Sequence, residues 1–140
     1  MKVTLERKND GFLFEGKSKT GTSVLIDNSS EPDAAGAGPM ELLLMGIGGC
    51  SAIDIVFILQ KQRQKIDNYS MEVIGERYEK EGAKPFKSVH VKVMLSGDIQ
   101  PEKAKRAAQL SFEKYCSVSL TMEPCVPVTY QVAVNGMVIE

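Results

Sequence analysis

The sequence predicts an α+β fold in which most of the sheet is antiparallel. Three observations support this prediction: short alternating segments bounded by turn residues, two segments of helical character, and no internal repeat or linker. In order, we expect three strands, a helix, two strands, a helix and a strand. The 140 residues are enough to bury a core without disulfides or a metal, so we expect one domain over residues 1–140.

The first three expected strands are short and surround turn signals. An Asn-Asp-Gly turn predicts a hairpin between strands at residues 2–8 and 12–16. A third strand is expected at residues 22–27. Residues 28–38 are mostly small and show no periodicity, which predicts a loop.

The most apolar part of the chain predicts helix. Pro39 suits the first turn of a helix that continues to Met45, and after a glycine-rich break the main helix should run from about residue 49 to about residue 65. The apolar residues within 53–59 cover nearly the whole circumference of that helix, which therefore needs partners on all sides. We expect no apolar run long enough to cross a bilayer.

Alternation returns in the second half of the chain, with strands expected at residues 69–78 and 88–95. Four apolar side chains should share one face of the second of these strands: Val89, Val91, Val93 and Leu95. Pro101 opens a second helix that ends near Tyr115, and a last strand at residues 127–138 is broken by an Asn-Gly turn.

The composition is that of a soluble protein. The chain is 43% hydrophobic and 25% charged, with a net charge of −1. It has no basic stripe that would indicate nucleic-acid binding, and its first ten residues lack the apolar core of a signal peptide, so we expect a soluble cytoplasmic protein. Three cysteines are too few for a structural disulfide framework, and in a reducing compartment a disulfide is more often transient.

Cys50 stands out because it follows a Gly-Ile-Gly-Gly stretch and precedes the long apolar run. We expect it near the start of a helix, where unpaired N–H groups and the helix dipole favour a thiolate. Thiolates attack peroxides and disulfides. The helix terminus contributes only about 0.3–2 kcal/mol, so a nearby cation is expected as well. A second cysteine, Cys116, lies far downstream, which makes a disulfide cycle conceivable.

Two segments resemble the OsmC/Ohr family of thiol-dependent hydroperoxide reductases. The first includes Pro39, Glu41, the glycines, Cys50 and Ser51, and the second is residues 114–118. Within the family, the run Gly-Gly-Cys-Ser-Ala-Ile-Asp is similar to the YhfA-like branch. The resemblance implies an OsmC-like fold, in which antiparallel sheets wrap around two central helices in an intertwined homodimer, with active sites at the dimer interface.

The resemblance also implies a chemistry. Cys50 would be the peroxidatic thiol that attacks an organic hydroperoxide, and Cys116 the resolving thiol that closes a disulfide with it, in defence against oxidative stress. Glu41 would be a supporting residue. An external dithiol, of the lipoyl type, would reduce the disulfide. No bound cofactor, metal, nucleic acid or membrane is expected.

The cation that assists the cysteine is not obvious. The Ohr relatives use an arginine from the N-terminal strands, paired with a glutamate before the first helix, and Arg7 is the one arginine in that part of this chain. Lys17 and Lys19 would supply charge without the planar fork of arginine. Arg77 and Arg106 are further candidates, although each is better interpreted as a surface salt-bridge residue.

Three further polar residues have no catalytic role in this prediction. Cys125 matches no family motif and is interpreted as structural or incidental. Asp54 lies one turn beyond Cys50, where a carboxylate would oppose a thiolate, so a hydrogen bond to backbone or to a partner subunit is expected instead. His90 falls on the strand face opposite the apolar residues and is interpreted as solvated.

Two functions remain open. Apolar residues around Cys50 would favour alkyl hydroperoxides over hydrogen peroxide, because each buried CH₂ contributes about 0.8 kcal/mol. These residues are Met40, Leu44, Met45 and Phe57. The alternative is a dimeric protein that binds an apolar small molecule, or a redox sensor, without efficient peroxidase turnover.

Overall fold

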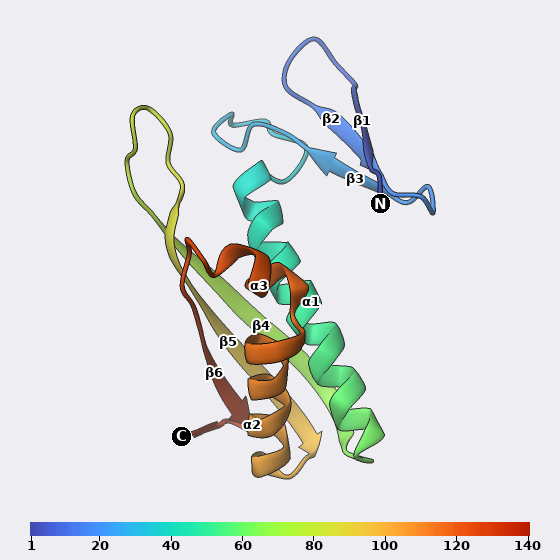
Figure 1. Ribbon diagram of the computed structural model, residues 1–140. Coiled ribbons are helices and arrows are strands. Elements are labelled where there is room, and N and C mark those ends of the chain that lie inside the picture. Colours follow the sequence, from blue (N-terminus) through green and yellow to red (C-terminus); the bar gives the residue numbers. More distant parts are fainter. The chain divides into compact units, whose positions relative to one another are not determined.

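The computed structural model describes all 140 residues as two compact units, Met1–Leu43 (unit 1) and Leu44–Glu140 (unit 2). The elements, in chain order, are β1 (Thr4–Arg7), β2 (Phe14–Lys17), β3 (Ser23–Ile26), α1 (Pro39–Lys61), β4 (Lys65–Arg77), β5 (Phe86–Asp98), α2 (Pro101–Leu110), η1 (Ser111–Tyr115), α3 (Ser117–Met122), β6 (Val128–Val134) and β7 (Met137–Ile139). Figure 1 shows these elements along the chain. The predicted α+β class is confirmed; a single domain stays a prediction.

Unit 1 contains a three-stranded antiparallel sheet in the order β1-β2-β3. The predicted hairpin is confirmed, and its turn is held by Asn9, whose Oδ1 accepts hydrogen bonds from the backbone N–H groups of Gly11 (3.0 Å) and Leu13 (3.1 Å). The loop after β3 is held by Asp27, whose Oδ2 accepts from the N–H of Ala35 at 2.9 Å. Local hydrogen bonds from backbone N–H groups to side-chain oxygens therefore hold the turn and the loop of this unit.

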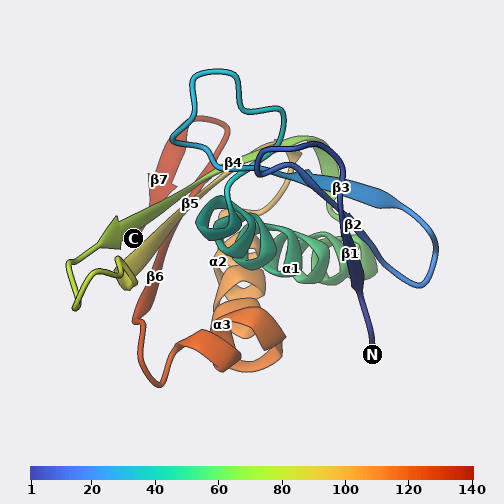
Figure 2. The same cartoon turned by 90° about the horizontal axis from the view of Figure 1, so that it is seen from above.

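Unit 2 contains a four-stranded sheet in the order β4-β5-β6-β7. β5 and β6 are parallel and the other neighbouring pairs are antiparallel. The parallel pair requires a crossover, which α2, η1 and α3 provide. Figure 2 shows α1 and α2 on the same face of this sheet. The four predicted core residues of β5 are buried there: Val89, Val91, Val93 and Leu95.

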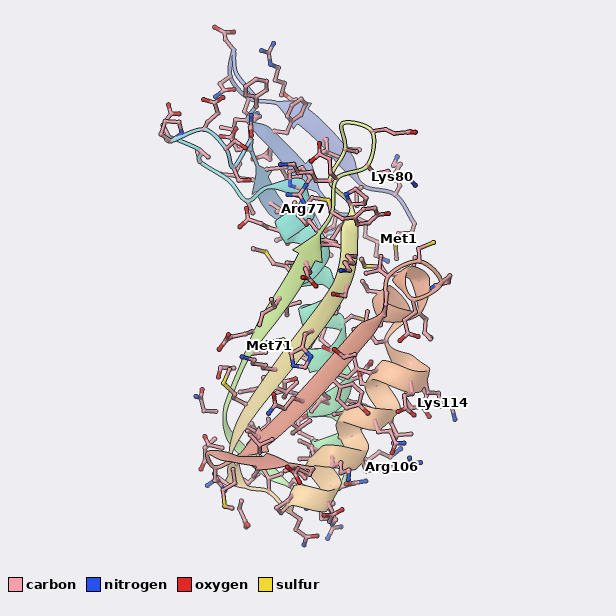
Figure 3. All side chains as sticks on the ribbon, turned by 90° about the vertical axis from the view of Figure 1, so that its left-hand side faces the viewer. Met1, Met71, Arg77, Lys80, Arg106 and Lys114 are labelled. Atoms are coloured by element: carbon pink, nitrogen blue, oxygen red, sulfur yellow. The ribbon has the colours of Figure 1, made fainter.

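The predicted break in the first helical region is wrong, because α1 is one continuous helix. Glycine inside a helix costs about 1 kcal/mol relative to alanine, so packing must offset that cost. At Gly48 it does: a Cβ there would lie 3.0 Å from Met71 Sδ and from Val73 Cγ2 of β4. Figure 3 shows Met71 on β4. The missing side chain lets the helix approach the strand at this position.

Both faces of α1 are apolar, but only one face packs against the rest of unit 2. The buried residues on this packed face are Ile47, Gly48, Ser51, Ile55 and Leu59. Ile53 and Phe57 are 73% and 64% exposed. The helix has 23 residues and an 18-residue window of mean hydropathy 2.3, so the expectation that no apolar run could cross a bilayer is wrong by length and composition. A core helix of a soluble protein has the same length and composition, and α1 packs one face on the sheet.

The C-terminal helical region also differs from the prediction. Instead of one helix ending near Tyr115, α2 ends at Leu110 and continues as a single π turn, in which the N–H of Cys116 donates to the carbonyl of Ser111 at 2.7 Å. The six-residue α3 follows and was not predicted. The last predicted strand is a hairpin of β6 and β7, because Asn135 and Gly136 turn the chain with positive φ.

Candidate functional site

The structure brings Cys50 of α1 next to Cys116, which lies between η1 and α3. Both cysteines are free thiols, Cys50 half-buried and Cys116 fully buried. The Cys50 side chain lies close enough to the Cys116 thiol to raise the pKa of that thiol. Two thiols that are distant in the sequence therefore meet inside unit 2, as a disulfide cycle requires.

Different groups around Cys116 shift the pKa of its thiol in opposite directions. Burial raises the pKa of the Cys116 thiol, hydrogen bonding to the backbone of Ser119 lowers this pKa, and the nearby Cys50 side chain raises it again. The backbone N–H of Ser119 donates to Cys116 Sγ at 3.5 Å. The Ser119 hydroxyl is itself buried and has no hydrogen-bond partner. Sequence reasoning missed Ser119, and its spacing three residues after the cysteine was the available signal.

Cys50 does not lie at a helix start. It is near the middle of α1, where the backbone N–H groups bond to carbonyls of the preceding turn. The predicted assistance from free N–H groups is therefore wrong, because the glycines before Cys50 belong to the helix interior. If Cys50 is activated, side chains must do it.

Asp54 accepts a hydrogen bond from a side chain of the same chain, where a bond to backbone or to a partner subunit was expected; a bond to a partner stays a prediction. The hydroxyl of Ser111, a fully buried residue at the start of η1, donates to Asp54 Oδ2 at 3.0 Å. This bond joins α1 to the π turn that precedes Cys116. Sequence reasoning gave Ser111 no role, since nothing in the sequence predicted the π turn.

Glu41 lies in the first turn of α1, where its Oε1 accepts from the N–H of Gly38 at 2.9 Å. Gly38 precedes Pro39, so this contact is the acidic half of a capping box and satisfies a helix-terminal donor. The structure thus explains Glu41 as a helix cap. Its supporting role in catalysis stays a prediction.

The three candidate arginines make hydrogen bonds, and Arg77 and Arg106 do not form the surface ion pairs expected for them. Arg7 donates through Nε to the carbonyl of Gly11 at 3.0 Å and through Nη2 to that of Asp10, which fastens the hairpin turn. Arg77 donates to the carbonyl of Lys84 at 2.7 Å, and Arg106 to Gln109 Oε1 at 2.9 Å. Figure 3 shows Arg77 at the end of β4 and Arg106 on α2, well apart from each other.

The remaining candidates have ordinary surroundings. His90 Nδ1 is hydrogen-bonded to Thr129 Oγ1 at 2.7 Å on the outer face of the sheet, and Cys125 is exposed. No three His, Cys, Asp or Glu side chains come together as a metal site.

A cavity of about 440 Å³ lies along α1, one to three turns beyond Cys50. Phe57, Ile58 and Leu110 form its apolar wall, and Asp54 and Lys61 contribute charge. Neither cysteine lines it. The cavity is large enough for part of a small ligand.

Comparison with known proteins gives the family. Residues 30–131 match the sequence model described as OsmC-like protein. Protein YhfA of Escherichia coli K12 is 40% identical over 122 residues, which cover 86% of this chain and 89% of YhfA. The crystal structure of a hypothetical protein from Aquifex aeolicus VF5 matches with a TM-score of 0.80 and 30% identity, covering 96% of each chain.

A more distant match carries a functional name. The organic hydroperoxide resistance protein OhrB of Bacillus subtilis matches with a TM-score of 0.60 and 22% identity, covering 94% of this chain and 96% of OhrB, which shows a shared fold. The resemblance to the OsmC/Ohr family and to its YhfA-like branch is thereby confirmed. With a family match over most of its length and a curated relative at 40% identity, this chain belongs to the OsmC-like protein family.

Proposed function

We propose that this protein is a thiol-dependent peroxidase that reduces organic hydroperoxides. The observation that carries the proposal is the contact between the Cys50 side chain and the Cys116 thiol inside unit 2. Membership of a family that includes proteins named for organic hydroperoxide resistance supports it. The fully buried Cys116 suits a resolving thiol, because it meets Cys50 without being open to solvent oxidants.

In the proposed cycle, the Cys50 thiolate attacks the outer oxygen of the hydroperoxide. The O–O bond breaks, an alcohol leaves, and Cys50 becomes a sulfenic acid. Cys116 then attacks the Cys50 sulfur, an S–S bond forms, and water leaves. An external dithiol, of the lipoyl type, reduces the disulfide by exchange. Apart from this dithiol, the cycle needs no cofactor.

We further propose that the protein acts as a cytoplasmic homodimer. Unit 2 leaves Ile53 and Phe57 of α1 uncovered, and unit 1 leaves Leu5 and Val24 of its sheet uncovered. Exposed large apolar side chains of this kind mark interaction sites where they gather in patches. Proteins of this family are typically homodimers, so a second copy of the chain is the proposed partner.

The test is a single turnover with a defined oxidant. Reduced protein is mixed with one equivalent of tert-butyl hydroperoxide, and free thiols are alkylated and located by mass spectrometry. We expect rapid loss of the Cys50 and Cys116 thiols, no loss in Cys50→Ser, and an unchanged result in the control Cys125→Ser. A Cys50 that stays alkylatable for minutes would refute the peroxidase.

The cavity beside α1 favours a second candidate function, the binding of an apolar small molecule. Native mass spectrometry of the purified protein would detect a bound ligand. Retention of that ligand by Cys50→Ser, together with a failed turnover experiment, would favour binding over catalysis.

A further inference from the structure

Ser111 is bonded to both cysteine-bearing segments. Its hydroxyl donates to Asp54 Oδ2 at 3.0 Å, and Asp54 lies one helical turn after Cys50 on α1. Its backbone carbonyl accepts from the N–H of Cys116 at 2.7 Å, which closes the π turn η1. Figure 1 shows α1 beside this turn and α3. The side chain of one buried serine therefore ties the Cys50 helix to the segment that presents Cys116.

The hydrogen bond between Asp54 and Ser111 matters because the π turn η1 sets the direction of the Cys116 side chain. A π turn holds its last residue by an i→i+5 bond, and such turns are rare and occur often at functional sites. If the segment relaxed to α-helical bonding, each residue of register would rotate a side chain by about 100° around the helix axis. Such a rotation at Cys116 would turn its thiol away from Cys50.

We propose that Asp54 is a positioning residue, whose hydrogen bond to Ser111 holds the π turn in the register that faces the Cys116 thiol toward Cys50. This inference rests on the proposed peroxidase function, for which it supplies the geometry of the resolving step. In that step the Cys116 sulfur attacks the Cys50 sulfenic acid, the S–O bond breaks, and the thiol proton leaves with the hydroxyl as water. Asp54 and Ser111 exchange no proton or electron in it.

Substitution at Asp54 separates a hydrogen-bonding role from a charge effect. Asn keeps a carbonyl oxygen that can accept from Ser111 but removes the negative charge, and Ala removes both. A carboxylate near a thiolate disfavours the thiolate, so a pure charge role would make Asn and Ala behave alike. A positioning role makes Asn resemble Asp.

The measurement is the equilibrium between the Cys50–Cys116 disulfide and glutathione in redox buffers, followed by alkylation and mass spectrometry in a Cys125→Ser background. It needs no hydroperoxide. We expect Asp54→Ala and Ser111→Ala each to lower the equilibrium constant for the disulfide about tenfold, and the double variant to lose no more than either single variant. Asp54→Asn should stay within about threefold of the parent.

The matched control is Thr129→Ala, which removes the His90–Thr129 hydrogen bond on the outer face of the same sheet. It should leave the disulfide equilibrium unchanged. Should Asp54→Ala fail to fold, Ser111→Ala decides the question, because it removes a single oxygen atom.

An unchanged equilibrium in Ser111→Ala, or an Asn variant as impaired as Ala, would overturn the positioning role. The proposed function can fail separately. If the variants behave as expected but tert-butyl hydroperoxide does not oxidise the parent protein, the positioning role stands and the peroxidase does not.

Discussion

Unit 1 and unit 2 are each stabilised internally by a different kind of interaction. Unit 2 buries a continuous apolar core between its sheet and the helices α1 and α2, with Ile55, Leu59 and Val91 fully inaccessible. Unit 1 buries no hydrophobic side chain at all. Its most buried polar residue is Asp27, whose carboxylate accepts hydrogen bonds from the backbone N–H groups of Asn28 and Ala35 and so holds a loop. Unit 2 resembles a complete domain, whereas unit 1 depends on local hydrogen bonds and leaves apolar surface for a partner.

The largest expected effect lies in the core of unit 2. Leu59→Ala should lower the free energy of unfolding by about 2–5 kcal/mol, because it leaves a cavity under α1. Urea denaturation measures this loss. The matched change in unit 1 is Leu5→Ala, at a side chain that is 56% exposed. If the proposed homodimer covers this side chain, the cost of Leu5→Ala should appear only at protein concentrations that favour the dimer. Equal costs at both positions in monomeric protein would contradict the contrast between the units.

An intermediate effect is expected where unit 1 is tightest. A Cβ at Gly36 would lie 2.6 Å from the carbonyl carbon and oxygen of Leu25, so Gly36→Ala must push the loop from β3 at a cost of about 1–3 kcal/mol. Hydrogen exchange should show faster exchange of the Ala37 N–H, which donates to Leu25. Gly11→Ala is the control, because its Cβ meets Asn9 only at ordinary contact distance. Unchanged exchange in Gly36→Ala would show that backbone packing does not hold this unit.

The smallest expected effect is the pH dependence of the stability of unit 2. Burial raises the pKa of the Cys116 thiol above the ordinary value of about 8.5 that it has in the unfolded chain. The Cys116 thiol therefore stays protonated to higher pH in the folded state than in the unfolded chain. Its contribution to the free energy of unfolding is fully present below the pKa of the unfolded state and is lost as the pH rises through the pKa of the folded state. Stability of the reduced protein should therefore fall in alkaline solution.

This loss is measured by urea unfolding at about pH 7 and about pH 9.5. Cys116→Ala should weaken the fall, and Cys125→Ala, which changes an exposed thiol, should not. If the parent protein, Cys116→Ala and Cys125→Ala all lost the same stability between the two pH values, the buried Cys116 thiol would not be the source of the loss.

Much of the fold could be predicted from the sequence, because strand alternation and turn residues are local signals. The hairpin at Asn9 and the buried row on β5 follow from them directly. The continuous α1 could not be predicted, since the close approach of Gly48 to Met71 and Val73 is a tertiary contact. Local propensity counts a glycine as a helix breaker unless such a contact is known.

The candidate site was predicted in part. Motif resemblance singled out Cys50 and Cys116, and the structure brings them together. The roles of Ser111 and Ser119 depend on a π turn and a short helix that no periodicity predicted. Glu41 was selected by resemblance alone, and its cap on Gly38 would have been visible as a glutamate three residues into a helix start.

The parallel pairing of β5 with β6 has a consequence for the newly made chain. Cys116 lies on the crossover between these strands, and β6 follows it in the sequence. Pairings between distant segments form late, because the intervening loop must be closed first. On the ribosome, we expect Cys50 and Cys116 to remain separate, alkylatable thiols until β6 has emerged, which alkylation of stalled nascent chains would test. The order of synthesis would thus keep the redox pair apart until nearly all of unit 2 has been made.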